Sequence, residues 1–309
     1  MISSFIITGF LGVGKTTLLI NTIKNFFNDK KIAIIVNEFG EVGIDGKILK
    51  NVYSEVLEIS EGCICCKLSE EFEKGVIEII KNYQPEIIFV ETSGTSEPFP
   101  IFLSLQNLRT SVEGIICVID TKNFDKYKEH STAKYQIGGS NILVLNKIDL
   151  VDEQTLQKVK QEVKEIKEKF NIKNVLTGEP IFKNYTIYET KFGVLPKEIF
   201  EGLYKIEDII NIGQSAYPSD HIVKDSFSQK IVYLPENVEF SYIDKILSNL
   251  PENIYRVKGV VKAKDVPVPL LVNYSFGDLS YTEMPEYKGK SFLIFIGSNI
   301  EERKLIQLN

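Results

Sequence analysis

The chain has 309 residues, enough for two domains of ordinary size, and its 43% hydrophobic and 25% charged content is typical of a globular protein. Lysine and arginine total 36 against 42 aspartates and glutamates, so the net charge is −6. This acidic balance disfavours binding to nucleic acid or to an anionic membrane surface. No apolar run reaches the ~18 residues of a membrane span, and the start MISSFIITGF lacks the features of a signal peptide. We therefore expect a cytoplasmic protein without nucleic-acid or membrane partners.

The first 180 residues alternate apolar runs with amphipathic stretches. Unalternating, β-branched runs are typical of strands buried on both faces of a sheet, and they lie at 4–8, 31–36, 86–90, 114–120 and 141–146. Helical spacing of apolar residues lies between and after them, at 16–27, 70–83 and 152–170. This order predicts an α/β fold, in which a mainly parallel sheet carries helices on both faces. Ligands of such sheets bind at the carboxyl ends of the strands.

The sequence texture changes after about residue 180. We expect irregular structure over 186–196, a last helix of the first domain over 198–210, and a linker in the turn-rich segment 211–220. Beyond the linker, strands are predicted at 221–234, 254–263, 269–276, 280–284 and 291–296, with helices at 241–250 and 299–308. The predicted organisation is therefore a domain at 1–210, a linker at 211–220 and a smaller α+β domain at 221–309.

A phosphate-binding motif follows the first predicted strand. Residues Gly9–Thr16 read GFLGVGKT, a full match to G-x-x-x-x-G-K-[ST] placed between a strand and a helix. Backbone N–H groups of such a loop surround a β-phosphate at the positive end of the helix. Lys15 would reach the β- and γ-phosphates, and Thr16 would bind Mg²⁺. The predicted contacts with nucleotide and Mg²⁺ in this loop are Gly9, Gly12, Val13, Gly14, Lys15, Thr16 and Thr17.

A base-recognition motif, NKID, ends the strand predicted at 141–146. The Asp149 carboxylate can accept hydrogen bonds from N1 and the 2-amino group of guanine, a donor pair that adenine lacks. Adenine would leave this carboxylate unpaired, which is costly. Asn146 would contact the purine edge and the Lys147 stem would cover the base. The motif therefore predicts GTP and not ATP.

A third motif, FVETSG, ends the strand predicted at 86–90. Glu91 is placed to hold Mg²⁺ through water, and the Gly94 N–H could sense the γ-phosphate. The sequence beside this segment offers no glutamine to orient the attacking water, so slow hydrolysis is expected. Catalysis is assigned to Lys15, Thr16 and Glu91, with Glu38 as a further candidate.

Three thiols lie close together in GCICC. Cys63, Cys65 and Cys66 can place two or three soft sulfurs on one ion, which suits Zn²⁺ and also Co²⁺ or Ni²⁺. A further ligand would come from the nearby carboxylates, Glu38, Glu41 or Asp45, and of these Glu41 is our candidate. The alternatives are reduced cysteines packed as small apolar side chains, or redox chemistry.

The remaining cysteine and the two histidines are expected to be outside any site. Cys117 lies within the apolar run GIICVID, so we expect a core residue. His130 lies in a lysine-rich polar segment and His221 begins a predicted strand, and both are expected at the surface.

The segments GFLGVGKTTLL, VNEFGEVGIDG, GCICCKLS, FVETSG and NKID, in this order, resemble the CobW-type P-loop GTPases. These belong to the CobW/HypB/UreG superfamily of metal chaperones and metal-insertion factors. The resemblance is most specific over residues 4–150, and 221–296 is similar to the smaller C-terminal domain of that family. It implies that Cys63, Cys65 and Cys66 form the metal-linked C-x-C-C motif. Two features depart from the family: no histidine-rich tract is present, and Val36 stands where some members carry glutamate.

Three functions agree with these motifs. The first is a metallochaperone that hydrolyses GTP with Mg²⁺, holds a divalent metal at the thiol loop and delivers it to a client metalloprotein or metal-cofactor enzyme. The γ-phosphate state of 37–46 and 91–98 would then set the metal affinity. The second is a GTPase of a cobalamin-type cofactor pathway, and the third is a regulatory GTPase with structural cysteines. A homodimer is compatible with each of them.

Overall fold

The computed structural model describes residues 2–38, 56–60, 67–108, 110–174, 177–200, 227–235 and 238–300. The chain divides into two compact units, Met1–Val223 and Lys224–Asn309. The predicted linker at 211–220 and most of the helices predicted at 198–210 and 299–308 lie outside the described residues. None of the helices within these ranges combines the length and the apolar character that crossing a bilayer requires.

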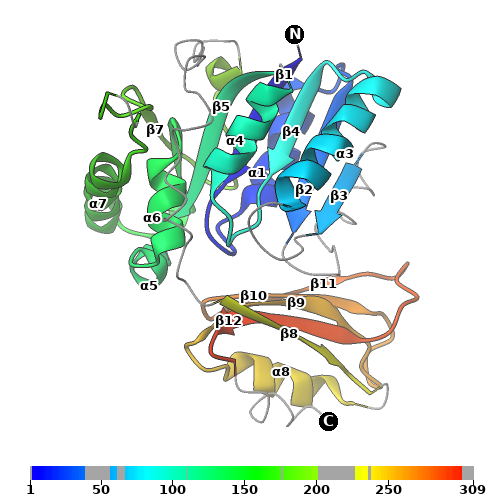
Figure 1. Cartoon of the computed structure of the whole chain (residues 1–309). Coiled ribbons are helices and arrows are strands. Elements are labelled where there is room, and N and C mark those ends of the chain that lie inside the picture. Colours follow the sequence, from blue (N-terminus) through cyan, green and yellow to red (C-terminus); the bar gives the residue numbers. More distant parts are fainter. Residues whose placement is uncertain are drawn as a thin grey trace. The chain divides into compact units, whose positions relative to one another are not determined.

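The first unit is built on a parallel sheet (Figure 1). Its strands are β1 (Ser3–Thr8), β2 (Ile32–Glu38), β3 (Val56–Ser60), β4 (Ile87–Glu91), β5 (Ser111–Asp120), β6 (Ile142–Asn146) and β7 (Thr186–Glu189). They lie in the order β3-β2-β4-β1-β5-β6-β7, and each described pair is parallel. Every residue of β4 and β6 is buried, as their unbroken apolar sequences predict.

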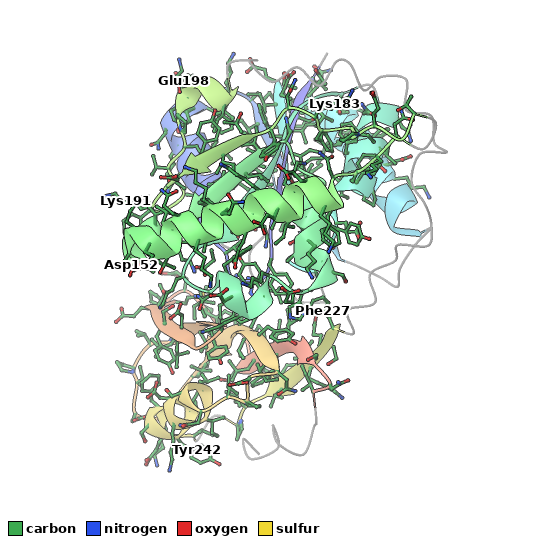
Figure 2. All side chains as sticks on the ribbon, turned by 90° about the vertical axis from the view of Figure 1, so that its left-hand side faces the viewer. Asp152, Lys183, Lys191, Glu198, Phe227 and Tyr242 are labelled. Atoms are coloured by element: carbon green, nitrogen blue, oxygen red, sulfur yellow. The ribbon has the colours of Figure 1, made fainter. Side chains whose placement is uncertain are left out.

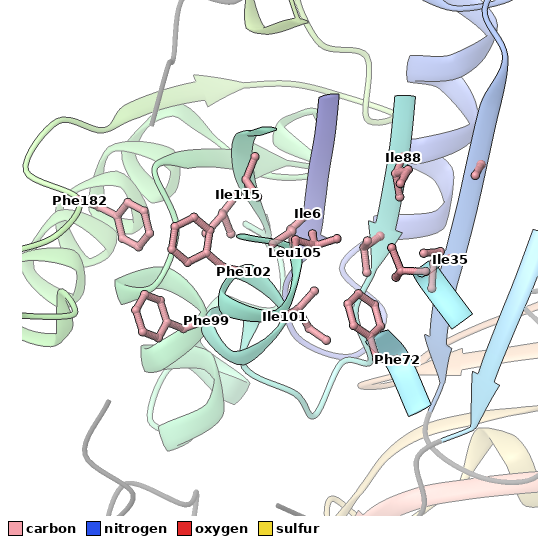
Figure 3. Close-up of a cluster of buried hydrophobic side chains, with 14 residues drawn as sticks. Ile6, Ile35, Phe72, Ile88, Phe99, Ile101, Phe102, Leu105, Ile115 and Phe182 are labelled. Carbon is pink, nitrogen blue, oxygen red and sulfur yellow. The ribbon is translucent and has the colours of Figure 1, made fainter. Parts of the chain in front are cut away.

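Helices cover both faces of this sheet, which confirms the predicted α/β class (Figure 1). They are α1 (Lys15–Phe26), α3 (Lys67–Tyr83), α4 (Pro98–Asn107), α5 (Phe124–Tyr127), α6 (Ser131–Gly138) and α7 (Glu153–Phe170), with 3-10 turns η1 (Ile148–Leu150) and η2 (Lys197–Phe200). Figure 3 shows Phe72 of α3 and Phe102 of α4 in one apolar cluster with Ile6 and Ile88 of the sheet. On the other face, the Phe27 ring after α1 meets Phe89 at 5.6 Å between centroids.

Several elements were not predicted from the sequence. The segment 186–196, expected to be irregular, contains β7, because pairing with β6 supplies the order that its four residues cannot supply alone. The short helices α4 and α6 and the strand β3 were also missed. By contrast, α7 agrees with its prediction, and Figure 2 shows it along its length with Asp152 at its amino-terminal end. The Asp152 carboxylate accepts a 2.8 Å hydrogen bond from the Thr155 N–H and so caps this helix.

The second unit is the predicted small α+β domain with an antiparallel sheet. Its strands are β8 (Phe227–Tyr233), β9 (Ile254–Val261), β10 (Leu270–Ser275), β11 (Asp278–Glu283) and β12 (Phe292–Ser298). They lie in the order β11-β10-β9-β12-β8. The helix α8 (Phe240–Ser248) places Ile243 and Leu247 in one apolar cluster with Val257, Val272 and Phe295 of the sheet. This unit therefore has a hydrophobic core of its own.

Candidate nucleotide site

The phosphate-loop motif lies between the end of β1 at Thr8 and the start of α1 at Lys15. Gly14 is the N-cap of α1 with φ 102°, so the loop enters the helix through a left-handed residue. The Lys15 ammonium donates hydrogen bonds to the carbonyls of Gly9 at 2.9 Å and Phe10 at 3.0 Å. Lys15 is buried, and a cation at the N-terminus of a helix is a favourable environment for an anion.

Thr16 and Glu91 meet beside this loop. Strands β1 and β4 are parallel neighbours with Ile7 opposite Glu91, so the end of β4 lies next to the loop. Thr16 Oγ1 donates a 2.7 Å hydrogen bond to Glu91 Oε1, and the carboxylate is buried. A hydroxyl and a carboxylate are the hard oxygen ligands that Mg²⁺ prefers, so these residues fit the ion predicted here. Thr17, also predicted at the site, is exposed on α1.

The base motif at the end of β6 is hydrogen-bonded to the phosphate loop. Asn146 Nδ2 donates to the Val13 carbonyl at 3.0 Å, and the Lys147 ammonium donates to the Gly12 carbonyl at 3.2 Å. Lys147 has φ 62°, and Asp149 follows it in η1 with an exposed side chain. The structure thus brings together two motifs that lie more than 130 residues apart in the sequence.

Asp120, which the sequence analysis did not select, holds the lysine of the base motif. Its register partner across β5 and β6 is Asn146. The buried Asp120 Oδ2 lies 2.6 Å from the Lys147 ammonium and accepts a 3.0 Å hydrogen bond from Asn123 Nδ2. The signal was present in GIICVID, where a carboxylate ends an apolar run as it does in FVE.

The loop after β7 also lies against the base motif. The Gly193 N–H donates to Asn146 Oδ1 at 3.2 Å, and the Ile148 N–H donates to the Thr190 carbonyl at 3.4 Å. Both polar atoms of the Asn146 side chain therefore bond to backbone: Nδ2 to the phosphate loop and Oδ1 to the loop after β7. The intervening Phe192 has φ 59° and is 66% exposed. The sequence signal for this loop is weak, because Gly193 lies in the segment 186–196, which was expected to be irregular.

Gly94 lies in close contact with the phosphate loop. A Cβ at this position would come within 2.9 Å of the Leu11 backbone nitrogen, so only glycine fits. The Gln136 side chain, from α6, donates to the carbonyls of Gly94 at 3.2 Å and Ser96 at 2.9 Å. Sequence reasoning found no glutamine beside this segment because Gln136 is 42 residues away along the chain.

Comparison with known proteins identifies the family of this chain. Residues 3–174 match the CobW/HypB/UreG nucleotide-binding domain, and residues 231–308 match the cobalamin synthesis protein CobW C-terminal domain. The chain belongs to the CobW/HypB/UreG family. The zinc chaperone YjiA of Escherichia coli is 27% identical, over 97% of this chain and 95% of that protein. The zinc chaperones CobW of Pseudomonas aeruginosa and of a Sinorhizobium species are 30% and 28% identical, over 86% and 88% of this chain and 78% and 84% of their own lengths.

The predicted metal loop of this CobW family member falls outside the described residues. Cys63, Cys65, Cys66 and Glu41 all lie there, and of Glu38 only the backbone at the end of β2 is described. Within the ranges that are described, no group of three or more His, Cys, Asp and Glu side chains is placed to hold a metal ion. The cysteine ligands therefore stay a prediction.

The other cysteine and histidine predictions can be compared with the structure in part. Cys117 is a buried core residue as expected, and burial raises the pKa of its thiol to about 12. His130 is half-buried and not fully at the surface, because its ring lies 5.2 Å from the ring of Phe10 in the phosphate loop. His221 lies outside the described residues.

Proposed function

We propose that this protein is a GTP-dependent metallochaperone that hydrolyses GTP with Mg²⁺ and delivers a divalent transition metal, in the first place Zn²⁺, to a client protein in the cytoplasm. The observation that carries the nucleotide part is the pair of hydrogen bonds from Asn146 and Lys147 to the phosphate loop. These bonds place the base motif beside the phosphate loop, which supports one ligand that carries both a base and phosphates. Relatives named zinc chaperones, similar along most of their lengths, support the metal part.

Guanine recognition would rest on Asp149. Asp149 has an exposed carboxylate and lies in η1, the turn that begins after Lys147. The Lys147 ammonium is held by the Asp120 carboxylate and the Gly12 carbonyl. With the ammonium held at that end, the aliphatic stem of Lys147 is free to cover one face of a purine. The carboxylate would accept the N1 and 2-amino hydrogens of guanine, while adenine would leave it unpaired.

Phosphate binding and hydrolysis would use the loop and the Thr16–Glu91 pair. Lys15 would exchange its present acceptors, two loop carbonyls, for β- and γ-phosphate oxygens. Thr16 and Glu91 would hold Mg²⁺, which when bound neutralises charge that develops on the phosphate oxygens. The Gly94 N–H would contact the γ-phosphate. Glu38 remains the candidate for orienting the attacking water, and we expect slow turnover.

Metal would bind at the thiol loop. Cys63, Cys65 and Cys66, with Glu41 as a further ligand, offer a soft donor set that suits Zn²⁺ better than Mg²⁺, and Co²⁺ and Ni²⁺ also fit it. If the γ-phosphate changes metal affinity, the metal must change GTP affinity by the same factor. The release of metal to a client would follow hydrolysis.

The nucleotide proposal is tested by Asp149→Asn. Xanthine carries oxygen where guanine has its 2-amino group, so the amide of the variant suits xanthine better than guanine. We expect GTP affinity to fall by about tenfold or more and the affinity for xanthosine triphosphate to rise, as measured by calorimetry. Asp125→Asn, at an exposed ion-paired aspartate, is the control and should bind like the wild type. An unchanged preference for GTP over ATP in Asp149→Asn would contradict the proposal.

The metal proposal is tested by titrating Zn²⁺ with and without a non-hydrolysable GTP analogue. We expect the wild type to bind Zn²⁺ more tightly in one nucleotide state, and Cys65→Ala plus Cys66→Ala to lose this binding. Cys117→Ala is the matched control, because it removes a thiol buried in the core. Analogue affinity that is identical with and without Zn²⁺ would rule out the gated chaperone and leave a GTPase.

A further inference from the structure

Gln136 is a buried side chain with an unusual set of contacts. It is 1% exposed and lies on α6, which follows β5 in the chain. Its Nε2 donates to the carbonyls of Gly94 and Ser96, which belong to the segment between β4 and α4. Both N–H bonds of this amide are therefore used to hold one short stretch of backbone.

The same stretch of backbone contacts the phosphate loop on its other side. The close approach of Gly94 to Leu11 leaves no room even for a methyl group. The C-cap of α6, Gly139, also lies near the start of α4, since a Cβ added at Gly139 would lie 3.3 Å from Cγ of Pro98. Gly94 is thus held between the loop that binds phosphate and the helix that carries Gln136.

The start of α6 is itself anchored to the phosphate loop. His130 is the N-cap of the helix, and its ring centroid lies 5.2 Å from that of Phe10. The Phe10 ring also stacks on Tyr127, with centroids 5.0 Å apart and planes 3° from parallel. The segment from Tyr127 to Gly139 therefore contacts both parts of the site, the loop through its rings and the Gly94 segment through Gln136.

The hydrogen bonding of Gln136 indicates that this side chain does more than fill space in the core. Its Oε1 is buried and has no hydrogen-bond partner among the residues that the structure describes. Leaving a carbonyl buried and unpaired is costly, and leucine or methionine of similar size would avoid that cost. The gain that offsets this cost is the pair of hydrogen bonds from Nε2 to the carbonyls of Gly94 and Ser96.

Gly94 needs such an external restraint. Glycine has the widest backbone freedom of all residues, so nothing within Gly94 itself fixes the direction of its N–H. The hydrogen bond to the Gly94 carbonyl orients the peptide plane after Gly94, and the bond to the Ser96 carbonyl orients the plane after Ser96. Together with the close approach of Gly94 to Leu11, these bonds restrict the direction in which the Gly94 N–H points. A donor aligned before the ligand binds does not have to be ordered during binding.

We propose that Gln136 is the positioning residue for γ-phosphate recognition: it holds the Gly94–Ser96 backbone against the phosphate loop so that the Gly94 N–H is aligned for the terminal phosphate. The inference rests on the proposed GTP-binding function of the site. The proposed contact distinguishes GTP from GDP, because GDP has no γ-phosphate to meet the Gly94 N–H. Gln136 itself would touch neither nucleotide nor water.

The test is the affinity of Gln136→Met for a non-hydrolysable GTP analogue and for GDP, both with Mg²⁺. Methionine fills a similar volume and cannot donate a hydrogen bond. We expect analogue affinity to fall by about tenfold, the worth of one well-placed hydrogen bond, and GDP affinity to change by less than about twofold. Single-turnover hydrolysis of saturating GTP should slow as well.

The controls separate positioning from a loss of stability. Asn141→Leu removes another buried amide, whose Oδ1 accepts a 2.8 Å hydrogen bond from the Ile115 N–H. Asn141 directly precedes β6, so it lies at the end of this strand that is opposite to the base motif. This control should lower thermal stability while leaving the ratio of analogue to GDP affinity unchanged. Gln136→Asn, one methylene too short to reach both carbonyls, should shift the ratio part of the way and provides the test if Gln136→Met does not fold.

An unchanged ratio of analogue to GDP affinity in folded Gln136 variants would overturn the inference. A parallel loss of both affinities would do the same, because it would mark a structural role only. These results differ from failure of the proposed function, in which the wild-type protein itself would show no preference for guanine nucleotides.

Discussion

Thr16 Oγ1 lies 2.7 Å from Glu91 Oε1, which joins the first turn of α1 to the end of β4. The two residues are 75 positions apart, and the parallel register of β1 with β4 brings them together. A buried carboxylate that accepts from a hydroxyl beside an anion-binding loop is suited to a divalent cation. We therefore expect Mg²⁺ to bind at this pair.

Replacing Glu91 by Gln should weaken nucleotide binding only when Mg²⁺ is present. The amide keeps the shape of the side chain and an acceptor for Thr16 but loses the negative charge, so we expect GTP affinity with Mg²⁺ to fall by about tenfold or more. With a chelator in place of Mg²⁺, the wild type and the variant should bind GTP alike. Glu113→Gln, at a carboxylate that accepts from Ser3 at 3.2 Å, is the control. Equal losses with and without Mg²⁺ would show that Glu91 acts on the loop and not through the ion.

Asp120→Asn should weaken GTP and GDP binding equally. The carboxylate is 1% exposed and pairs with Lys147 at 2.6 Å, so its loss leaves a partly buried ammonium without its counter-charge. The lysine stem would then be less well fixed over the base, which both nucleotides share. We expect about a tenfold loss of affinity for each, measured by calorimetry, together with a lower Tm.

Asp125→Asn is the matched control for Asp120→Asn. Asp125 also pairs with lysines, Lys128 and Lys158, but its side chain is 61% exposed and such pairs contribute little. If Asp120→Asn bound GDP normally and lost only GTP, the role assigned to the Lys147 pair would be wrong, since the base cannot distinguish the two nucleotides.

The sequence predicts the parts of this site whose chemistry is local. The phosphate loop, Glu91 and the NKID motif each follow an apolar strand, and strand ends of a parallel sheet share one edge. Gln136 and Gly193 could not be predicted in this way, because their contacts depend on which strands and helices become neighbours. The helix α6 has a mixed STAKYQIG sequence of eight residues that gives no clear apolar stripe. Its position becomes evident only once β5 and β6 are paired.

Gly193→Ala should destabilise the fold and disturb the base site. Gly193 has φ 65°, and a Cβ there would lie 2.7 Å from Leu18 Cα, so the loop after β7 would have to move. The movement would break the 3.2 Å bond from its N–H to Asn146 Oδ1. We expect a loss of about 2–4 kcal/mol in the free energy of unfolding and weaker binding of guanine nucleotides.

Gly178→Ala provides the comparison for Gly193→Ala. Gly178 has nearly the same backbone angle, φ 71°, but no atom lies within 4 Å of an added Cβ. Alanine at this position should therefore cost only the conformational penalty of about 1–2 kcal/mol and leave nucleotide binding unchanged. Chemical denaturation and calorimetry measure both quantities, and equal effects of the two substitutions would show that the clash with Leu18 is relieved without moving Asn146.

Lys167 should make the stability of the first unit depend on pH above neutrality. The side chain is fully buried on α7, where its ammonium donates to the carbonyls of Gly138 at 2.7 Å and Ser140 at 2.6 Å. Burial lowers the pKa of Lys167 from 10.5 to about 7. At a pH between these two pKa values, Lys167 carries the proton in the unfolded chain and not in the folded chain. The free energy of unfolding should therefore rise with pH, by about 1.4 kcal/mol per pH unit for this group.

Denaturation of the wild type and Lys167→Met at several pH values from 7 to 10 tests this. Every other titratable residue is common to both proteins, so the difference between their unfolding free energies isolates Lys167. We expect the stability of the wild type to increase relative to that of the variant as pH rises. Lys164→Met, on the exposed side of the same helix, should follow the wild-type slope. Parallel pH profiles for the wild type and Lys167→Met would mean that the two carbonyls, with the Phe182 ring 5.2 Å away, keep the ammonium charged throughout this range despite its burial.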